Sequence, residues 1–427
     1  MVGKCQWCPI MNLSKFRTHN PHMNVMFVGL VFLFYHYYNF SLEASNVANK
    51  FYSANSSFVA FVFTVAPYTF SSLMAPFGGL LFAKLQKHSS NYIFPYIFLA
   101  DALLSVISNF ISHHIYLPNM LYFAMLCRII QGALLGGMLP QYVLYIYAKS
   151  YNLNERVNYG NLFFILFYLA IMAAIIGVNF FSKDVLYHFN EYFSMAYVLL
   201  ALLIFSYRSL WHNFHIDNVC INHSWSLGKT WQQNRGSILR FTFFITFMAS
   251  LNAYFVTVMP YFLVKFLNYS VEAVYLMQLF IISCGIVGFI LGGIFHARIG
   301  RKFHLSLGLL LKLLLFLMFH FYVSHDFEFV MFIGASCLFC CGLMASKILM
   351  ILNSIFVAPS RLYGIALTYN LSWGLMFGFS GFIVMRMMFT FNNLYIPSLL
   401  IMFFSYISLI SLWFTPNKDF FRYLELK

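Results

Sequence analysis

Four ionisable side chains, His36, Asp101, Arg128 and Lys347, interrupt long apolar runs of this 427-residue sequence. A guanidinium group at the centre of a membrane helix costs about 2.5–3.5 kcal/mol on insertion scales, so Arg128 needs a charged partner or a water-filled cavity. Arginine holds carboxylates through two parallel hydrogen bonds. Arg128 is therefore a candidate site for the carboxylate of an anionic or zwitterionic organic solute. A structural ion pair with Asp101 is the alternative.

Asp101 and His36 are the candidate groups for binding and releasing a proton. A carboxyl group buried in a membrane protein can exchange a proton near neutral pH, and so can an imidazole group. Each residue also has a simpler interpretation. Asp101 can pair with a cation, and His36 can pack among the aromatic residues that follow it in the sequence. The sequence therefore leaves proton coupling open.

Other polar side chains within the apolar runs can bind a solute or link neighbouring helices by hydrogen bonds. Lys347 can attract anions into a cavity, or extend its ammonium group to the membrane interface instead. The neutral residues predicted to line a solute site are Asn39, Gln131, Asn252, Tyr254, Tyr369 and Asn370.

The composition places these residues in a membrane. Hydrophobic residues make up 62% of the chain and charged residues 8%, against about 25% charged residues in soluble domains. Apolar runs of about 20 residues predict spanning α-helices, because each helix satisfies its own backbone hydrogen bonds in lipid. The aromatic residues, 21% of the chain, are expected mostly to face lipid or the membrane interface. Twelve apolar runs lie near residues 24–40, 57–83, 92–112, 119–148, 160–181, 190–207, 240–264, 273–295, 303–323, 328–353, 361–388 and 395–414.

A hydrophilic interruption divides the twelve predicted helices into two sets of six. Most of the 25 Lys and Arg residues fall on the side of the membrane that carries both chain ends, which predicts cytoplasmic termini. The net charge of +14 is therefore interpreted as a topology signal and not as a nucleic-acid-binding surface. The predicted organisation is a cytoplasmic N-terminal tail (1–23), an N-terminal six-helix bundle (24–207), a cytoplasmic linker (208–239), a C-terminal six-helix bundle (240–414) and a cytoplasmic C-terminal tail (415–427).

Two related stretches indicate an internal duplication. GGIFHARIGRK runs from Gly292 to Lys302, and GGLLFAKLQKH runs from Gly78 to His88, half a chain length earlier. Each joins two predicted helices through a short basic turn, so the two bundles are expected to be pseudo-symmetric. Small residues permit close helix packing, and basic side chains cap helix ends at the interface. The residues of these turns predicted to act in interhelical packing and gating are Gly78, Gly79, Gly292, Gly293, Arg298, Gly300, Arg301 and Lys302.

Two six-helix halves with a repeated Gly-Gly and basic turn resemble the major facilitator superfamily. Two further runs are similar to its metabolite:proton symporter branch, which includes proline/betaine, dicarboxylate and shikimate carriers. One is RxxQGxxxGG, which begins at Arg128; the other is RxYGxxxxYN, which runs from Arg361 through Gly364 to Asn370. In that superfamily helices 1, 4, 7 and 10 line the solute site, so the resemblance implies a site near Arg128 on the fourth helix. It also implies gating roles for Arg361 and Gly364 at the start of the eleventh helix.

The resemblance implies a secondary active transporter or facilitator of a small organic solute, such as proline, a betaine-like osmolyte or a carboxylate metabolite, that works by alternating access. Acidic residues of the family pattern are replaced here by His36, Asn39 and Met138, so coupling to protons is open. A carrier-derived paralogue that acts as a sensor, or no longer transports, is the alternative. The resemblance also favours a monomer in a bacterial cytoplasmic (inner) membrane.

An enzyme is not predicted from this sequence. Membrane-embedded enzymes need clustered catalytic side chains near one interface, and the pair His113 and His114 has no acidic residues nearby in the sequence. Cys5 and Cys8 form a CxxC pair without a second pair at zinc spacing. The expected partners are therefore the lipid bilayer and a small-molecule solute, together with protons if transport is coupled. No cofactor, metal or nucleic acid is expected.

Overall fold

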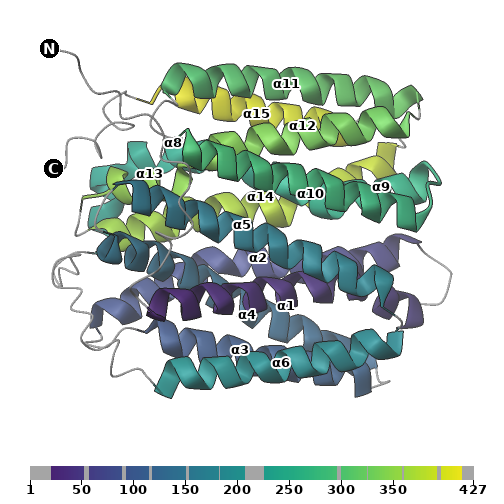
Figure 1. Cartoon of the computed structure of the whole chain (residues 1–427), viewed down its shortest axis with the longest axis horizontal. Coiled ribbons are helices and arrows are strands. Elements are labelled where there is room, and N and C mark those ends of the chain that lie inside the picture. Colours follow the sequence, from purple (N-terminus) through teal and green to yellow (C-terminus); the bar gives the residue numbers. More distant parts are fainter. Residues whose placement is uncertain are drawn as a thin grey trace, which may run out of the picture.

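The computed structural model describes residues 21–51, 57–88, 93–114, 118–150, 153–181, 183–206, 226–295, 300–324, 326–357, 360–391 and 396–415. Within these ranges the chain is almost entirely helical and contains no strand (Figure 1). The all-α architecture predicted from the apolar runs is therefore confirmed.

The helices follow the predicted order along the chain. The first half forms α1 (Pro21–Phe51), α2 (Ser57–His88), α3 (Phe94–His114), α4 (Pro118–Lys149), α5 (Leu153–Phe180) and α6 (Lys183–Ser206). The second half forms α8 (Leu227–Ala253), the π-helix η3 (Tyr254–Val258), α9 (Met259–Phe266), α10 (Val271–Ile294), α11 (Arg301–Ser324), α12 (Phe327–Ala345), α13 (Ile348–Ile355), α14 (Arg361–Phe391) and α15 (Ile396–Trp413). Because α8, η3 and α9 are continuous and only two turn residues separate α12 from α13, the described residues form twelve helical segments.

The length and composition of these helices suit a bilayer. Within the described part of the chain, six segments are long and apolar enough to cross a membrane: Met125–Tyr147, Asn154–Phe180, His188–Ser206, Leu227–Val256, Val271–Ile294 and Phe327–Ile355. Large apolar side chains such as Leu199 on α6 and Phe332 on α12 are more than 60% exposed on the outside of the molecule. An exposed apolar surface of this kind is what hydrocarbon solvates.

The two halves of the chain occupy separate parts of the molecule, with α1–α6 on one side and the later helices on the other (Figure 1). They meet where α2 packs along α14 and where α5 packs along α10. At the second contact the rings of Phe164 and Phe289 stack with their centroids 5.0 Å apart and their planes at 16°. A continuous apolar core extends through both halves.

One pair of helices in each half packs with the backbones in direct contact. A Cβ atom added to Gly136 of α4 would collide with the carbonyl group of Ala75 on α2, and one added to Gly342 of α12 would lie 2.5 Å from the carbonyl oxygen of Gly285 on α10. Small residues make such close approach possible. The helices involved are the second and fourth of each set of six, so the same packing occurs in both halves, as expected for a duplicated chain.

The helix after the predicted linker begins earlier than the hydropathy pattern indicated. The linker was predicted to extend to residue 239, but α8 begins at Leu227. Its N-terminus is capped by Ser226, whose hydroxyl oxygen accepts a hydrogen bond of 3.3 Å from the backbone N–H of Lys229. The polar residues Gln232 and Arg235 that follow are exposed. This first part of α8 is stabilised by its N-terminal cap and by backbone hydrogen bonds. A hydropathy pattern detects neither of these.

A π-helical turn interrupts the same segment at Tyr254–Val258. Pro260 has no backbone N–H to donate to the carbonyl oxygen of Val256, four residues earlier. The side-chain amide of Gln278 on α10 donates to that oxygen instead, at 2.9 Å. The sequence predicted one uninterrupted helix here, and the proline explains the difference.

Candidate functional site

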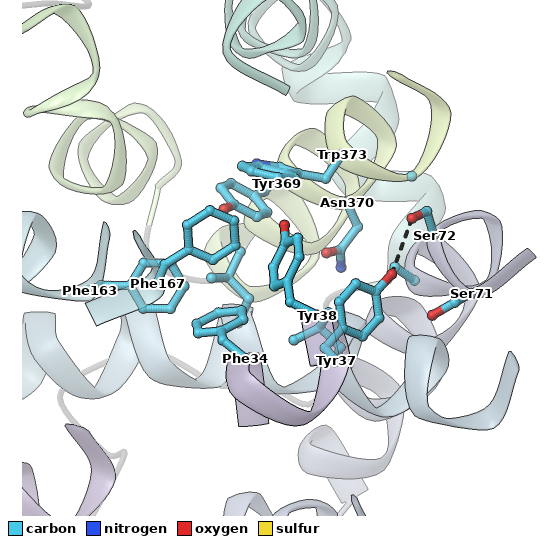
Figure 2. A pocket seen from close by; sticks show the side chains of 14 residues that line it. Phe34, Tyr37, Tyr38, Ser71, Ser72, Phe163, Phe167, Tyr369, Asn370 and Trp373 are labelled. Atoms are coloured by element: carbon cyan, nitrogen blue, oxygen red, sulfur yellow. Dashed lines mark hydrogen bonds between the residues drawn. The ribbon is translucent and has the colours of Figure 1, made fainter. Parts of the chain in front are cut away.

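A cavity lies between the two halves, about midway along the helices that line it (Figure 2). Its wall is built from α1, α2, α4 and α5 of the first half and from α14 of the second. Its volume is about 60 Å³, which is enough to hold ordered water. The lining residues are Phe34, Tyr37, Tyr38, Ser71, Ser72, Ala75, Leu135, Leu139, Phe163, Phe167, Tyr369, Asn370, Trp373 and Gly374.

Aromatic rings form much of this wall. The ring of Phe167 contacts those of Phe34, Tyr38 and Trp373 in near-perpendicular arrangements, with centroid distances of 4.9, 5.5 and 5.7 Å. Tyr369 and Trp373 stack on α14, with their centroids 5.7 Å apart. Edge-to-face contacts of this kind are favourable and hold the rings in defined orientations. The wall therefore presents ordered aromatic surfaces.

The aromatic residues come from regular positions on their helices. Side chains four residues apart share one face of a helix. Three lining helices each place two aromatic residues at this spacing, and the pairs are Phe34 and Tyr38 on α1, Phe163 and Phe167 on α5, and Tyr369 and Trp373 on α14.

The polar groups of the cavity are neutral. The hydroxyl groups of Tyr37 and Ser72 form a hydrogen bond of 3.4 Å, drawn as a dashed line in Figure 2. The side-chain amide of Asn370 donates to the carbonyl oxygen of Gly136 on α4, at 2.7 Å. None of the described residues that line the cavity is Lys, Arg, His, Asp or Glu. The site thus offers aromatic faces and a few uncharged hydrogen-bonding groups.

Two of the residues predicted to bind solute, Tyr369 and Asn370, line the cavity. They follow each other on α14, and Figure 2 shows them beside Tyr38. The other residues predicted to bind solute are buried in the described structure but are not part of the cavity wall: Asn39, Arg128, Gln131, Asn252, Tyr254 and Lys347. Their roles in solute binding stay predictions.

Arg128 lies within the first half, together with both candidate proton-binding groups. Its guanidinium donates to the carbonyl oxygen of His36 at 3.2 Å and interacts electrostatically with Asp101. Tyr197 of α6 donates its hydroxyl proton to Asp101 Oδ2 at 2.9 Å. The ring of Tyr197 also stacks on that of His36, with centroids 5.6 Å apart. The structure therefore joins these predicted residues into one buried cluster beside the cavity.

The resemblance placed helices 7 and 10 of the superfamily at the solute site, whereas none of the described cavity-lining residues lies on α8–α9 or α12–α13. The polar residues of these helices have other contacts. Asn252 of α8 accepts a hydrogen bond of 2.6 Å from the hydroxyl of Tyr168 on α5, which links the two halves. Lys347 is buried at the turn between α12 and α13. Gln131, in the first half, also has a contact away from the cavity. Its side-chain amide donates to the hydroxyl of Ser105 at 2.9 Å and so joins α4 to α3.

The halves also touch at the end of the molecule predicted to be cytoplasmic. The side-chain amide of Asn353 on α13 donates to the carbonyl oxygen of Val143 on α4 at 3.0 Å. The guanidinium groups of Arg156 on α5 and Arg361 on α14 lie 4.0 and 4.3 Å from the ring centroid of Tyr147 on α4. Cation–π contacts of this length are attractive. Arg361, a predicted gating residue, therefore connects the two halves at this end.

The glycines predicted to act in packing lie at close contacts between helices. A Cβ atom added to Gly78 would overlap the backbone of Ala133 on α4, and one added to Gly292 would lie 2.7 Å from the Cβ atom of Ser346. Gly364 packs against the ring of Phe356.

The basic part of the second turn is only partly described. Arg298 lies outside the described residues, and for Arg301 and Lys302 the structure describes the helix backbone alone. Gly300 has open space where a Cβ atom would lie. The gating role predicted for these residues stays a prediction.

Most aromatic residues of the cavity, and both of its serines, were missed in the sequence. The aromatic residues were expected mostly to face lipid. A usable signal was the repeated four-residue spacing of aromatic pairs in three predicted helices. Ser71 and Ser72, adjacent within the second predicted helix, were a further polar interruption of an apolar run.

The fold of this chain is similar to that of solved structures, although its sequence matches no known family. No family model matches the sequence, and no curated protein matches it. Similar solved structures include the major facilitator superfamily proton:xylose symporter XylE bound to 6-bromo-6-deoxy-D-glucose, with a TM-score of 0.69, 13% identity and coverage of 92% of this chain and 95% of that chain. A D-xylose-proton symporter has a TM-score of 0.62, 14% identity and coverage of 93% and 99%. A bacterial homologue of the human lysosomal transporter Spinster, in an inward-facing and occupied conformation, has a TM-score of 0.59, 13% identity and coverage of 93% and 97%. The chain therefore has the all-α membrane fold of the major facilitator superfamily.

Proposed function

We propose that this protein is a secondary transporter or facilitator that moves a small organic solute across a membrane by alternating access. The observation that carries the proposal is the cavity between the halves, which lies midway along helices from both of them. Solute sites of secondary transporters lie near the bilayer midplane, between two structural repeats. The solved structures with this fold include sugar symporters, which supports the same general activity here.

Solute exchange with the cytoplasm would require the two halves to separate at the end of the molecule predicted to be cytoplasmic. The halves are joined there by the hydrogen bond from Asn353 to Val143 and the cation–π contact between Arg361 and Tyr147. Each contributes about 0.5–2 kcal/mol in proteins generally. Contacts of this size can hold one conformation and still break during each transport cycle.

The resemblance in α4 and α14 suggests proline, a betaine-like osmolyte or a carboxylate metabolite as the solute, whereas the neutral lining of the cavity favours an uncharged one, as argued below. Proton coupling would involve Asp101 or His36. A protonation change there can reach the cavity through α1, because Arg128 is bound to the carbonyl oxygen of His36 and the next two residues, Tyr37 and Tyr38, line the cavity. We further propose a monomer in a bacterial inner membrane, with both termini in the cytoplasm.

A carrier-derived sensor is the second candidate function. It is favoured by the replacement of acidic residues of the family pattern by His36, Asn39 and Met138, all of which are buried in the first half. A sensor would bind the solute without exchanging it across the membrane. Solute exchange by purified protein in proteoliposomes therefore separates the two functions.

Alternating access is tested by linking the halves at the cytoplasmic end. In a variant without the eight native cysteines, Val143→Cys and Asn353→Cys place thiols on α4 and α13 where the halves meet. A short bis-thiol reagent that bridges them should stop exchange of every solute. The matched control is Asn109→Cys with Ser194→Cys, which bridges α3 and α6 inside the first half. Exchange that survives the α4–α13 bridge would refute alternating access.

A further inference from the structure

The chemistry of the cavity narrows the class of solute, an inference that rests on the transport function proposed above. We infer that the solute is an uncharged small organic molecule with a flat, apolar or aromatic body and a hydroxyl or amide group at one end.

An anionic solute fits this cavity poorly. A carboxylate moved from water into the cavity loses its hydration, and no described lining residue carries a positive charge to replace it. The guanidinium of Arg128 is held in the first half by the carbonyl oxygen of His36. The faces of aromatic rings are the negative part of their charge distribution and repel anions. Carboxylates are therefore disfavoured, although the family resemblance includes carboxylate carriers.

A cationic solute lacks a counter-charge as well. Aromatic faces attract cations, and this effect alone would favour an organic ammonium ion. None of the described lining residues is Asp or Glu, however, so a cation would lose its hydration with only aromatic faces to replace it. The aromatic attraction is therefore offset by this desolvation, whereas an uncharged molecule needs no compensation.

The cavity has an apolar end and a polar end. Figure 2 shows Phe34, Phe163 and Phe167 on one side, and Ser71 and Ser72 on the other. A flat apolar body can lie among the phenylalanine rings, and hydroxyl groups are available to hydrogen-bond its polar group.

Asn370 adds an acceptor to the cavity wall. Its amide nitrogen already donates to the carbonyl oxygen of Gly136, so its amide oxygen is the group best placed to meet a ligand. An acceptor of this kind matches the hydrogen atom of a hydroxyl or amide group. The site therefore fits an uncharged donor better than a carboxylate, which has no hydrogen atom to offer.

Three planar probes of the same size separate the charge classes: benzamide is neutral, benzoate is an anion and benzamidinium is a cation at pH 7. Their binding to the full chain in lipid nanodiscs can be measured by calorimetry. We expect benzamide to bind at least tenfold more tightly than either ion. Benzoate or benzamidinium binding as tightly as benzamide, or no binding of benzamide, would overturn the inference.

Two tryptophans test whether the probe occupies this cavity. Trp373 lines the cavity, whereas Trp413 on α15 is 67% exposed on the outside. Trp373→Ala should weaken benzamide binding at least tenfold, Trp373→Phe should change it less than threefold, and Trp413→Ala should leave it unchanged. If Trp373→Ala does not fold, Phe163→Leu removes a ring from the apolar end with little loss of volume and should weaken binding similarly. Equal affinity in all these variants would exclude the cavity as the site.

The solute class and the transport function can fail separately. Exchange of other solutes by a protein that ignores benzamide would overturn the inferred class and leave the proposed transport intact. Benzamide binding in the cavity without exchange of any solute in proteoliposomes would leave the ligand class intact and refute transport.

Discussion

Gly79 of α2 lies directly against the side-chain amide of Asn370 on α14, and a Cβ atom added to this glycine would overlap the amide nitrogen. The second half contains the counterpart, because a Cβ atom added to Gly293 of α10 would overlap the side-chain amide of Asn161 on α5. In both cases the second glycine of a repeated turn contacts an asparagine of the opposite half. The duplication evident in the sequence is therefore repeated in the contacts between the halves.

Gly79→Ala should disturb this contact. The added methyl group would push the amide of Asn370 away from the carbonyl oxygen of Gly136, and overpacking of this kind costs about 1–3 kcal/mol. We expect a lower melting temperature in detergent and slower solute exchange. The matched control is Gly236→Ala on α8, where the nearest atom to an added Cβ is 3.9 Å away. If both variants unfold at the same temperature, the α2–α14 contact accommodates the added methyl group without loss of stability.

Arg128→Met should destabilise the first half more than a surface substitution does. It would remove the guanidinium that donates to the carbonyl oxygen of His36 and acts electrostatically on Asp101, and a buried acceptor left without its donor costs about 1–3 kcal/mol. Adding Asp101→Asn removes the carboxyl group on which this charge acts and should recover part of the loss. The measurement is a double-mutant cycle on unfolding in mixed micelles with increasing SDS, and Arg235→Met on the exposed part of α8 is the control. Additive effects of the two substitutions would mean that these charges are not coupled.

The same double variant tests the role in transport predicted for Arg128. If the guanidinium binds solute or takes part in proton coupling, the protein should insert and fold but exchange no solute. A folded Arg128→Met/Asp101→Asn protein that exchanges solute at the full rate would remove Arg128 from the solute site.

The fold could be predicted from the sequence because a bilayer imposes a length on each spanning helix. Apolar runs in two sets of six therefore indicated the architecture. The start predicted for α8, near residue 240, differs from the structure. Leu227 and the residues after it form a capped polar helix that hydropathy does not detect. The π-turn at Tyr254 was also missed, because hydropathy shows neither the backbone donor that Pro260 lacks nor the amide of Gln278, on another helix, that replaces it.

The site was less predictable than the fold for a chemical reason. Asn370 stood out as an amide within an apolar run, and it does line the cavity. Phe163 and Phe167 did not stand out, because a phenylalanine that faces lipid and one that faces a cavity are equally apolar. Arg128 carries a charge that is conspicuous in the sequence, and in the structure this charge acts electrostatically on the alternative partner, Asp101. In a membrane protein, charge marks unusual residues but does not show which helix face meets the solute.

Gln278→Leu should destabilise the π-turn. The substitution leaves the carbonyl oxygen of Val256 without the amide donor, and a buried unsatisfied acceptor costs about 1–3 kcal/mol. Pro260→Ala supplies a backbone N–H four residues after Val256 and should restore part of the loss when combined with Gln278→Leu. Unfolding in SDS-containing micelles measures both effects, with Gln233→Leu on the exposed part of α8 as the control. No difference between the Gln278→Leu and Gln233→Leu proteins would show that this hydrogen bond contributes nothing.

Leu135→Lys should reverse the charge preference of the cavity. Leu135 lies in the cavity wall on α4 and is only partly buried, so a lysine there can direct its ammonium group into the cavity. Benzoate would then have a counter-charge and should bind at least tenfold more tightly than it does to the unmodified protein, while benzamidinium should bind more weakly. Leu135→Gln adds a polar group of similar size without charge and should not favour benzoate. Because Coulomb attraction falls with distance, benzoate affinity that is the same in both variants would place the bound probe away from α4 and outside this cavity.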